Sequence, residues 1–70
     1  MNRPDIIATR LRKAMSAREL TQKDLAELAH CSESTIRSIQ KQERGVSVAL
    51  AVDIAKALNV RPAWLLDLEE

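Results

Sequence analysis

The chain has few residues of several types, and each shortage excludes a class of protein. One cysteine among 70 residues cannot form an internal disulfide, which fits a reducing compartment. One glycine and two prolines are few for a protein built from strands and tight turns. Phenylalanine and tyrosine are absent and there is one tryptophan, so aliphatic side chains must supply nearly all of the core. These shortages favour short helices packed on one another.

The sequence also lacks long apolar runs and an excess of charge of one sign. No run of about 18 apolar residues occurs, so we expect no membrane span, and residues 1–5 lack the apolar segment of a signal peptide. A net charge of +1 excludes a strongly basic protein that coats nucleic acid, but it is compatible with one locally basic face. With 46% hydrophobic residues, residues 1–70 are expected to form one small domain in the cytoplasm.

Apolar spacing and capping residues predict five helices. Residues that cap a helix or suit its first turn occur at Pro4, Thr21, Ser32, Ser47 and Pro62. Between these positions the apolar residues recur every three to four residues, as on the buried face of a helix. The expected helices lie near residues 4–17, 22–29, 33–41, 48–58 and 62–68, and residues 67–70 form an acidic tail.

Residues 22–41 carry the main functional signal. Two short helices joined by a turn of about three residues form a helix-turn-helix arrangement. In the second of these helices, Ile36 and Ile39 are expected to face the core. The opposite face carries a polar stripe made up of Ser34, Arg37, Ser38 and Lys41. Such a helix fits a DNA major groove about 12 Å wide, where Arg37 suits a guanine edge or a phosphate and Glu33 suits a cytosine amino group.

The polar residues also have purely structural interpretations. The stripe suits an ordinary solvated face, and a carboxylate at the position of Glu33 stabilises any helix through its dipole. A basic cluster fits a solvated surface and a phosphate-binding surface equally well, and it comprises Arg3, Arg10, Arg12 and Lys13. No residues have the spacing of a catalytic or metal site, so we expect no enzyme activity, no metal, no cofactor and no small-molecule ligand.

Four segments, taken in order, resemble one known family. They are Leu20–Ala29, Ser32–Ile39, Asp53–Val60 and Pro62–Leu66. They resemble the lambda-repressor-like (XRE-type) helix-turn-helix family, which includes phage Cro proteins and repressors. The resemblance covers roughly residues 6–66 and implies an all-α, five-helix domain whose third helix contacts DNA.

The resemblance, together with the polar stripe, assigns roles to individual residues. The residues expected to contact bases are Glu33, Ser34, Arg37 and Ser38. The residues expected to contact phosphates are Gln22, Lys23, Lys41 and Arg44. Family members often dimerise through the end of the domain, and the residues expected there are Arg61, Leu66 and Leu68.

The chain departs from the family pattern at two kinds of position. The family often pairs an arginine in the first helix with a glutamate ending the third, and this chain has Met15 and Gln40 there. Because both charges are absent, neither is left buried without a partner. Glycine is common in the family where this chain has Glu19, His30 and Gln42, although histidine can adopt positive φ at some cost.

The sequence therefore predicts a sequence-specific DNA-binding transcription regulator. We expect a phage or prophage Cro-like repressor that binds a palindromic operator as a homodimer. An antitoxin-type module that holds a toxin, with DNA autoregulation secondary, is the alternative, and the DNA-binding domain of a longer repressor is a third interpretation.

Overall fold

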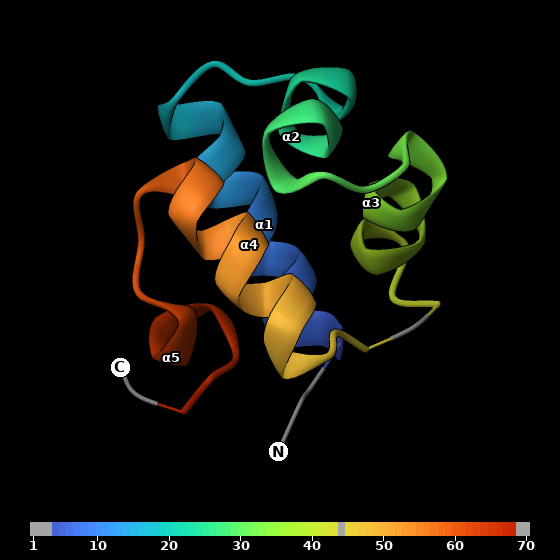
Figure 1. Cartoon of the computed structure of the whole chain (residues 1–70). Helices are drawn as coiled ribbons and strands as arrows, with labels where there is room; N and C mark the ends of the chain where they lie inside the picture. Colours follow the sequence, from blue (N-terminus) through green and yellow to red (C-terminus); the bar gives the residue numbers. More distant parts are fainter. Residues whose placement is uncertain (1–3, 44, 69–70) are drawn as a thin grey trace.

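The computed structural model describes residues 4–43 and 45–68, and over these residues it consists of five helices joined by short connections (Figure 1). None of these helices combines the length and the apolarity needed to cross a bilayer. Three helices have the predicted bounds, α3 ends one residue early and α5 ends three residues early. The helices are α1 (Pro4–Ala17), α2 (Gln22–Ala29), α3 (Glu33–Gln40), α4 (Val48–Leu58) and α5 (Pro62–Leu65).

The helices begin at the predicted capping residues. The hydroxyls of Thr21, Ser32 and Ser47 each accept a hydrogen bond from the backbone N–H three residues later, at 3.0 to 3.2 Å. Each bond satisfies one of the N–H groups that a first helical turn leaves without a backbone partner. The starts of α2, α3 and α4 are therefore fixed by local sequence.

All five helices end in the same way, on a residue in the left-handed region of backbone space. At each end, the N–H of the following residue donates to the carbonyl five residues earlier, at 2.8 to 3.0 Å. This is the Schellman closure, which usually has glycine at the left-handed position. Here φ lies between 55° and 64° at Glu19, His30, Gln42, Asn59 and Asp67.

The end of α5 corrects the predicted helix at residues 62–68. Asp67 adopts φ 62°, and the N–H of Leu68 donates to the carbonyl of Ala63 at 2.8 Å. The chain therefore turns back after Leu65 instead of continuing the helix. An aspartate in this conformation carries no strong sequence signal, because glycine and asparagine are the usual residues at a helix closure.

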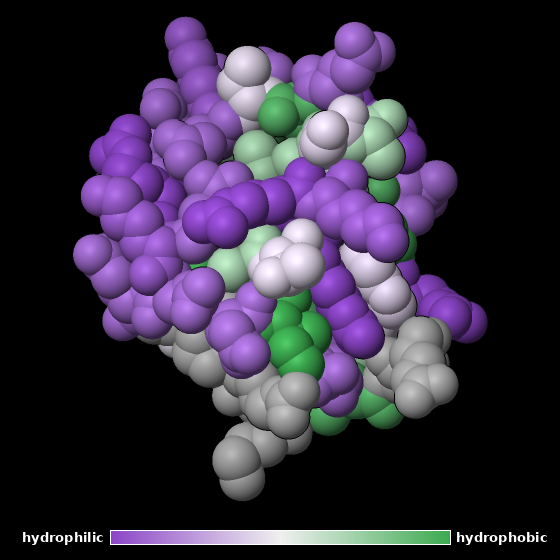
Figure 2. All heavy atoms as spheres, turned by 180° about the vertical axis from the view of Figure 1, so that it is seen from behind, coloured by the Kyte–Doolittle hydropathy of each residue, from purple (hydrophilic) through white to green (hydrophobic). Residues whose placement is uncertain are grey.

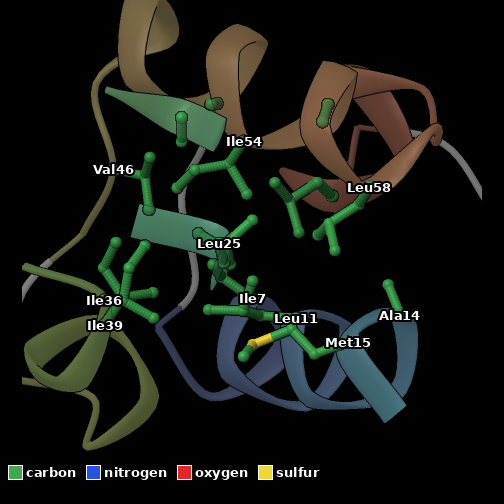
Figure 3. Packing of buried hydrophobic residues seen from close by; sticks show 14 of the residues in the cluster. Ile7, Leu11, Ala14, Met15, Leu25, Ile36, Ile39, Val46, Ile54 and Leu58 are labelled. Atoms are coloured by element: carbon green, nitrogen blue, oxygen red, sulfur yellow. The ribbon is translucent and has the colours of Figure 1, made fainter. Parts of the chain in front are cut away.

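The core is aliphatic, as the composition predicts. α2 packs on α3 and α4, α1 packs on α3 and α5, and α4 packs on α5. The side chains between these helices point toward one another in a single cluster (Figure 3). The largest fully buried side chains are those of Ile7, Leu11, Leu25, Ile36, Ile39, Ile54, Leu58 and Leu65. This cluster holds α3 by one face and leaves its other face on the surface.

Candidate nucleic-acid interface

The orientation of α3 follows from two isoleucines and one cap. Ile36 and Ile39 are almost completely buried, at 0% and 1% exposed. At the start of the helix, the Ser32 hydroxyl accepts from the N–H of Thr35 at 3.2 Å and lies 2.9 Å from the Thr35 hydroxyl. The core and the cap together fix both the rotation of α3 and the place where it begins.

Four of the five polar residues predicted on or beside α3 are exposed, and Ser38 is half-buried. The exposed residues are Glu33, Ser34, Arg37 and Lys41. The Ser34 hydroxyl lies 3.1 Å from that of Ser32, so it is held close to the helix start. With its side chains a helix is about 10–12 Å in diameter, which fits the width of a major groove, and the eight residues of α3 make it about 12 Å long. Hydrophilic residues cover the side of the molecule on which α3 lies, at the left in Figure 2.

α2 presents its first residues beside α3. Thr21 and Asp24 form a capping box, in which the N–H of Thr21 donates to Asp24 Oδ2 at 3.1 Å. This backbone hydrogen bond, the Thr21 hydroxyl and the nearby Lys23 ammonium together lower the pKa of Asp24. Gln22 is half-buried and Lys23 is exposed in this capped first turn.

The turn between α2 and α3 keeps its geometry without glycine. His30 adopts φ 58° and ψ 44°, so the sequence expectation that histidine would accept this position is confirmed. Cys31 follows it, is half-buried and packs against the core. Cys31 therefore serves as the compact apolar residue of the turn.

A chain of contacts involving Gln22, which the sequence does not reveal, joins the starts and ends of three helices. Gln40, at the end of α3, accepts a hydrogen bond through Oε1 from the Nε2 of Gln22. The Nε2 of Gln40 in turn donates to the sulfur of Met15 at 3.3 Å. Met15 and Gln40 are the two positions where the family often carries an ion pair, so the contact persists here between neutral groups.

Two members of the basic cluster contact other parts of the chain. Arg12 donates to the backbone carbonyl of Gln40 at 2.6 Å. Arg10 lies over the ring of Trp64, donates to the Trp64 carbonyl and forms an ion pair with Asp67 at 3.5 Å. Both arginines therefore tie α1 to a neighbouring element, whereas Lys13 is exposed.

The residues expected at a dimer interface divide into two groups. Arg61 is exposed and Leu68 is 61% exposed. Leu66 is 4% exposed and belongs to the core cluster, which corrects the expectation that its side chain lies on the surface. The early end of α5 explains the difference, because the turn at Asp67 directs Leu66 inward and Leu68 outward.

Some predicted residues lie outside the described part of the chain. Arg44, expected to contact phosphate, is one of them, and so is Arg3 of the basic cluster. The last two residues of the acidic tail, Glu69 and Glu70, are also outside it.

Comparisons with known proteins agree with this arrangement. Residues 10–65 match the family described as Helix-turn-helix (HTH_3). The chain is 42% identical over 62 residues to the HTH-type transcriptional regulator PrtR of Pseudomonas aeruginosa. The aligned residues cover 89% of this chain and 24% of PrtR. The chain thus spans about a quarter of the length of that relative.

Two further relatives are matched over most of their length. The chain is 32% identical over 66 residues to the control protein C.SmaI of Serratia marcescens, covering 94% of this chain and 79% of the relative. The crystal structure of the restriction-modification controller protein C.AhdI from Aeromonas hydrophila superposes with a TM-score of 0.80 at 30% identity, covering 84% of this chain and 89% of the other. From the family match and these relatives, we conclude that the chain belongs to the helix-turn-helix family, which confirms the resemblance found in its sequence.

Proposed function

We propose that the protein is a sequence-specific DNA-binding transcription regulator that inserts α3 into the major groove. The exposed polar face of α3 carries this proposal, because caps and core packing hold it rigidly on the surface. Membership of the helix-turn-helix family supports the same function.

The candidate residues divide by the chemistry that they offer to DNA. Arg37 can donate two parallel hydrogen bonds to a guanine edge, and Glu33, Ser34 and Ser38 offer shorter groups to neighbouring bases. Gln22, Lys23 and Lys41 suit phosphate oxygens, which contribute affinity but little sequence information. Base contacts by serine are loose, so we expect the deformability of the DNA to add to specificity.

The proposal is tested by removing Arg37. The Arg37→Ala variant is expected to bind its operator about 5- to 150-fold more weakly, because a good bidentate base contact contributes about 1–3 kcal/mol. The operator is first obtained by selection from random duplexes, and affinity is then measured across salt concentrations. Circular dichroism should be unchanged, since Arg37 is exposed.

Lys56→Ala is the matched control, because it removes one exposed positive charge from the last turn of α4. That end of α4 lies away from α3 (Figure 1). Lys56→Ala should leave affinity nearly unchanged. If Arg37→Ala binds the operator as tightly as Lys56→Ala does, α3 does not recognise DNA as proposed. The same conclusion follows if the wild-type chain prefers no DNA sequence at low salt.

We further propose that the protein binds a palindromic operator as a homodimer. Two half-sites about 34–36 Å apart would present the same groove face to two copies of α3. The exposed Leu68 and Arg61, beyond and before α5, support an interface at this end of the chain.

Two kinds of gene are candidates for regulation by this protein. The sequence favours a phage or prophage Cro-like repressor. One relative is named a control protein and the solved neighbour a restriction-modification controller, which favours control of a restriction-modification system. Genes for a nuclease and a methyltransferase beside this one would support the controller, whereas phage early genes would support the repressor.

A further inference from the structure

Gln40 lies where three helices meet at the proposed DNA-binding face. Its backbone carbonyl accepts from Arg12 of α1 at 2.6 Å. Its side-chain Nε2 donates to Met15 of the same helix at 3.3 Å, and its Oε1 accepts from Gln22 at the start of α2. Both ends of its carboxamide and its backbone are therefore engaged, which fixes the orientation of the amide.

The contact to Gln22 has a geometric consequence for that residue. The Nε2 of Gln22 carries two hydrogens in the plane of its carboxamide, at about 120° to each other. Because one hydrogen is directed at Gln40, the direction of the second is set as well. A half-buried glutamine that would otherwise sample many rotamers thus presents one N–H in a defined direction.

We infer that Gln40 is a positioning residue for DNA binding: it orients the Gln22 carboxamide so that the second N–H donates to a phosphate oxygen. The inference rests on the proposed function, in which Gln22 contacts phosphate. Gln40 itself does not touch the DNA. It acts by removing, before binding, the rotamer freedom that Gln22 would lose on the phosphate.

Neutral groups suit this role at this position. A glutamate in place of Gln40 would also accept from Gln22, but it would place a negative charge close to the phosphate that Gln22 binds. A carboxamide accepts the same hydrogen bond without that repulsion. Its N–H₂ group also needs an acceptor, and the sulfur of Met15 provides one.

The test is a double-mutant cycle on operator binding by the full chain. Gln40→Met keeps the length of the side chain and removes its oxygen acceptor, and Gln22→Ala removes the group that is positioned. We expect Gln40→Met to weaken binding about three- to tenfold, the range for one ordered side chain. In the Gln22→Ala background, Gln40→Met should change affinity less than twofold, because no carboxamide remains to be oriented.

Gln42→Met makes the same chemical change two residues further on, at an exposed site, and should show no coupling to Gln22→Ala. Met15→Leu is a second variant, conservative in volume, in case Gln40→Met does not fold. Met15→Leu removes the acceptor of Gln40 Nε2, so we expect it to weaken binding less than Gln40→Met does. This loss of affinity should also vanish in the Gln22→Ala background. Thermal unfolding without DNA separates loss of stability from loss of binding.

Two negative outcomes are distinguishable. If the wild type binds an operator but the loss caused by Gln40→Met persists without Gln22, Gln40 has only a structural role and this inference alone is overturned. If the wild type prefers no DNA sequence at all, the proposed function fails, and the inference fails with it.

Discussion

The left-handed residues that end the helices all carry a side chain. An L-residue in this region brings its β-carbon close to the following carbonyl oxygen, at a cost of about 1–2 kcal/mol that glycine avoids. Glu19, His30 and Asn59 are each followed by a residue that packs against the core. These following residues are Leu20, Cys31 and Val60. Tertiary packing therefore stabilises these turns where glycine would otherwise do so.

Glu19→Gly should stabilise the protein. Glu19 is exposed, and φ of 55° costs glycine nothing, although glycine also gains freedom in the unfolded chain. The net gain in the free energy of unfolding should be about 0.5–1 kcal/mol, seen as a rise of a few degrees in Tm. Glu19→Ala keeps the β-carbon and is the matched control. Equal Tm values for the two variants would show that the backbone at Glu19 is not strained.

Local signals determine where the helices begin better than where they end. The starts of α2, α3 and α4 were predictable because a Thr or Ser cap acts through hydrogen bonds to its own chain. The end of α5 was not predictable from the sequence, because the turn at Asp67 depends on contacts with α1. The same holds in the candidate site, where the exposed stripe on α3 follows from helical spacing but the contact between Gln22 and Gln40 joins two helices.

Of the five elements, α5 depends most on its neighbours. It has four residues, and no side chain caps its start. Arg10 of α1 holds it through the Trp64 ring at 5.2 Å, the Trp64 carbonyl and the Asp67 carboxylate. One arginine thus contacts the aromatic residue, the backbone and the closing turn of the same short helix.

Replacing Arg10 should loosen α5. Arg10→Met keeps much of the apolar stem and removes the guanidinium, so the free energy of unfolding should fall by about 1–3 kcal/mol. The fluorescence of Trp64, the one tryptophan in the chain, should change in the folded state. Lys13→Met on the same helix is the control and should do neither, since Lys13 is exposed. Unchanged emission and stability in Arg10→Met would contradict this account of α5.

Across the whole molecule, the small net charge conceals an uneven distribution. Residues 1–45 contain nine basic and six acidic groups, whereas residues 46–70 contain two basic and four acidic groups. The first part includes α2 and α3, and the second includes α4, α5 and the proposed dimer interface. The resulting field is modest, so direct contacts should contribute more to DNA recognition than long-range steering does.

The proposed dimer gives a prediction at this scale. Under two-fold symmetry the interface would bury two Leu68 side chains, one from each copy, so Leu68→Asp should weaken the dimer about tenfold or more. Sedimentation equilibrium over a range of concentrations measures the change. Leu28→Asp is the matched control, because Leu28 is 53% exposed and Leu68 is 61% exposed. Dimers of equal strength in both variants would place the interface elsewhere.

The absence of glycine from the helix closures also bears on how the protein folds. A turn that closes on glycine can form early and alone, whereas a turn that depends on core packing is stable only once the core exists. A peptide covering residues 22–41 would therefore not hold its turn at His30. The chain should unfold in one cooperative step, with helix content and Trp64 fluorescence lost together.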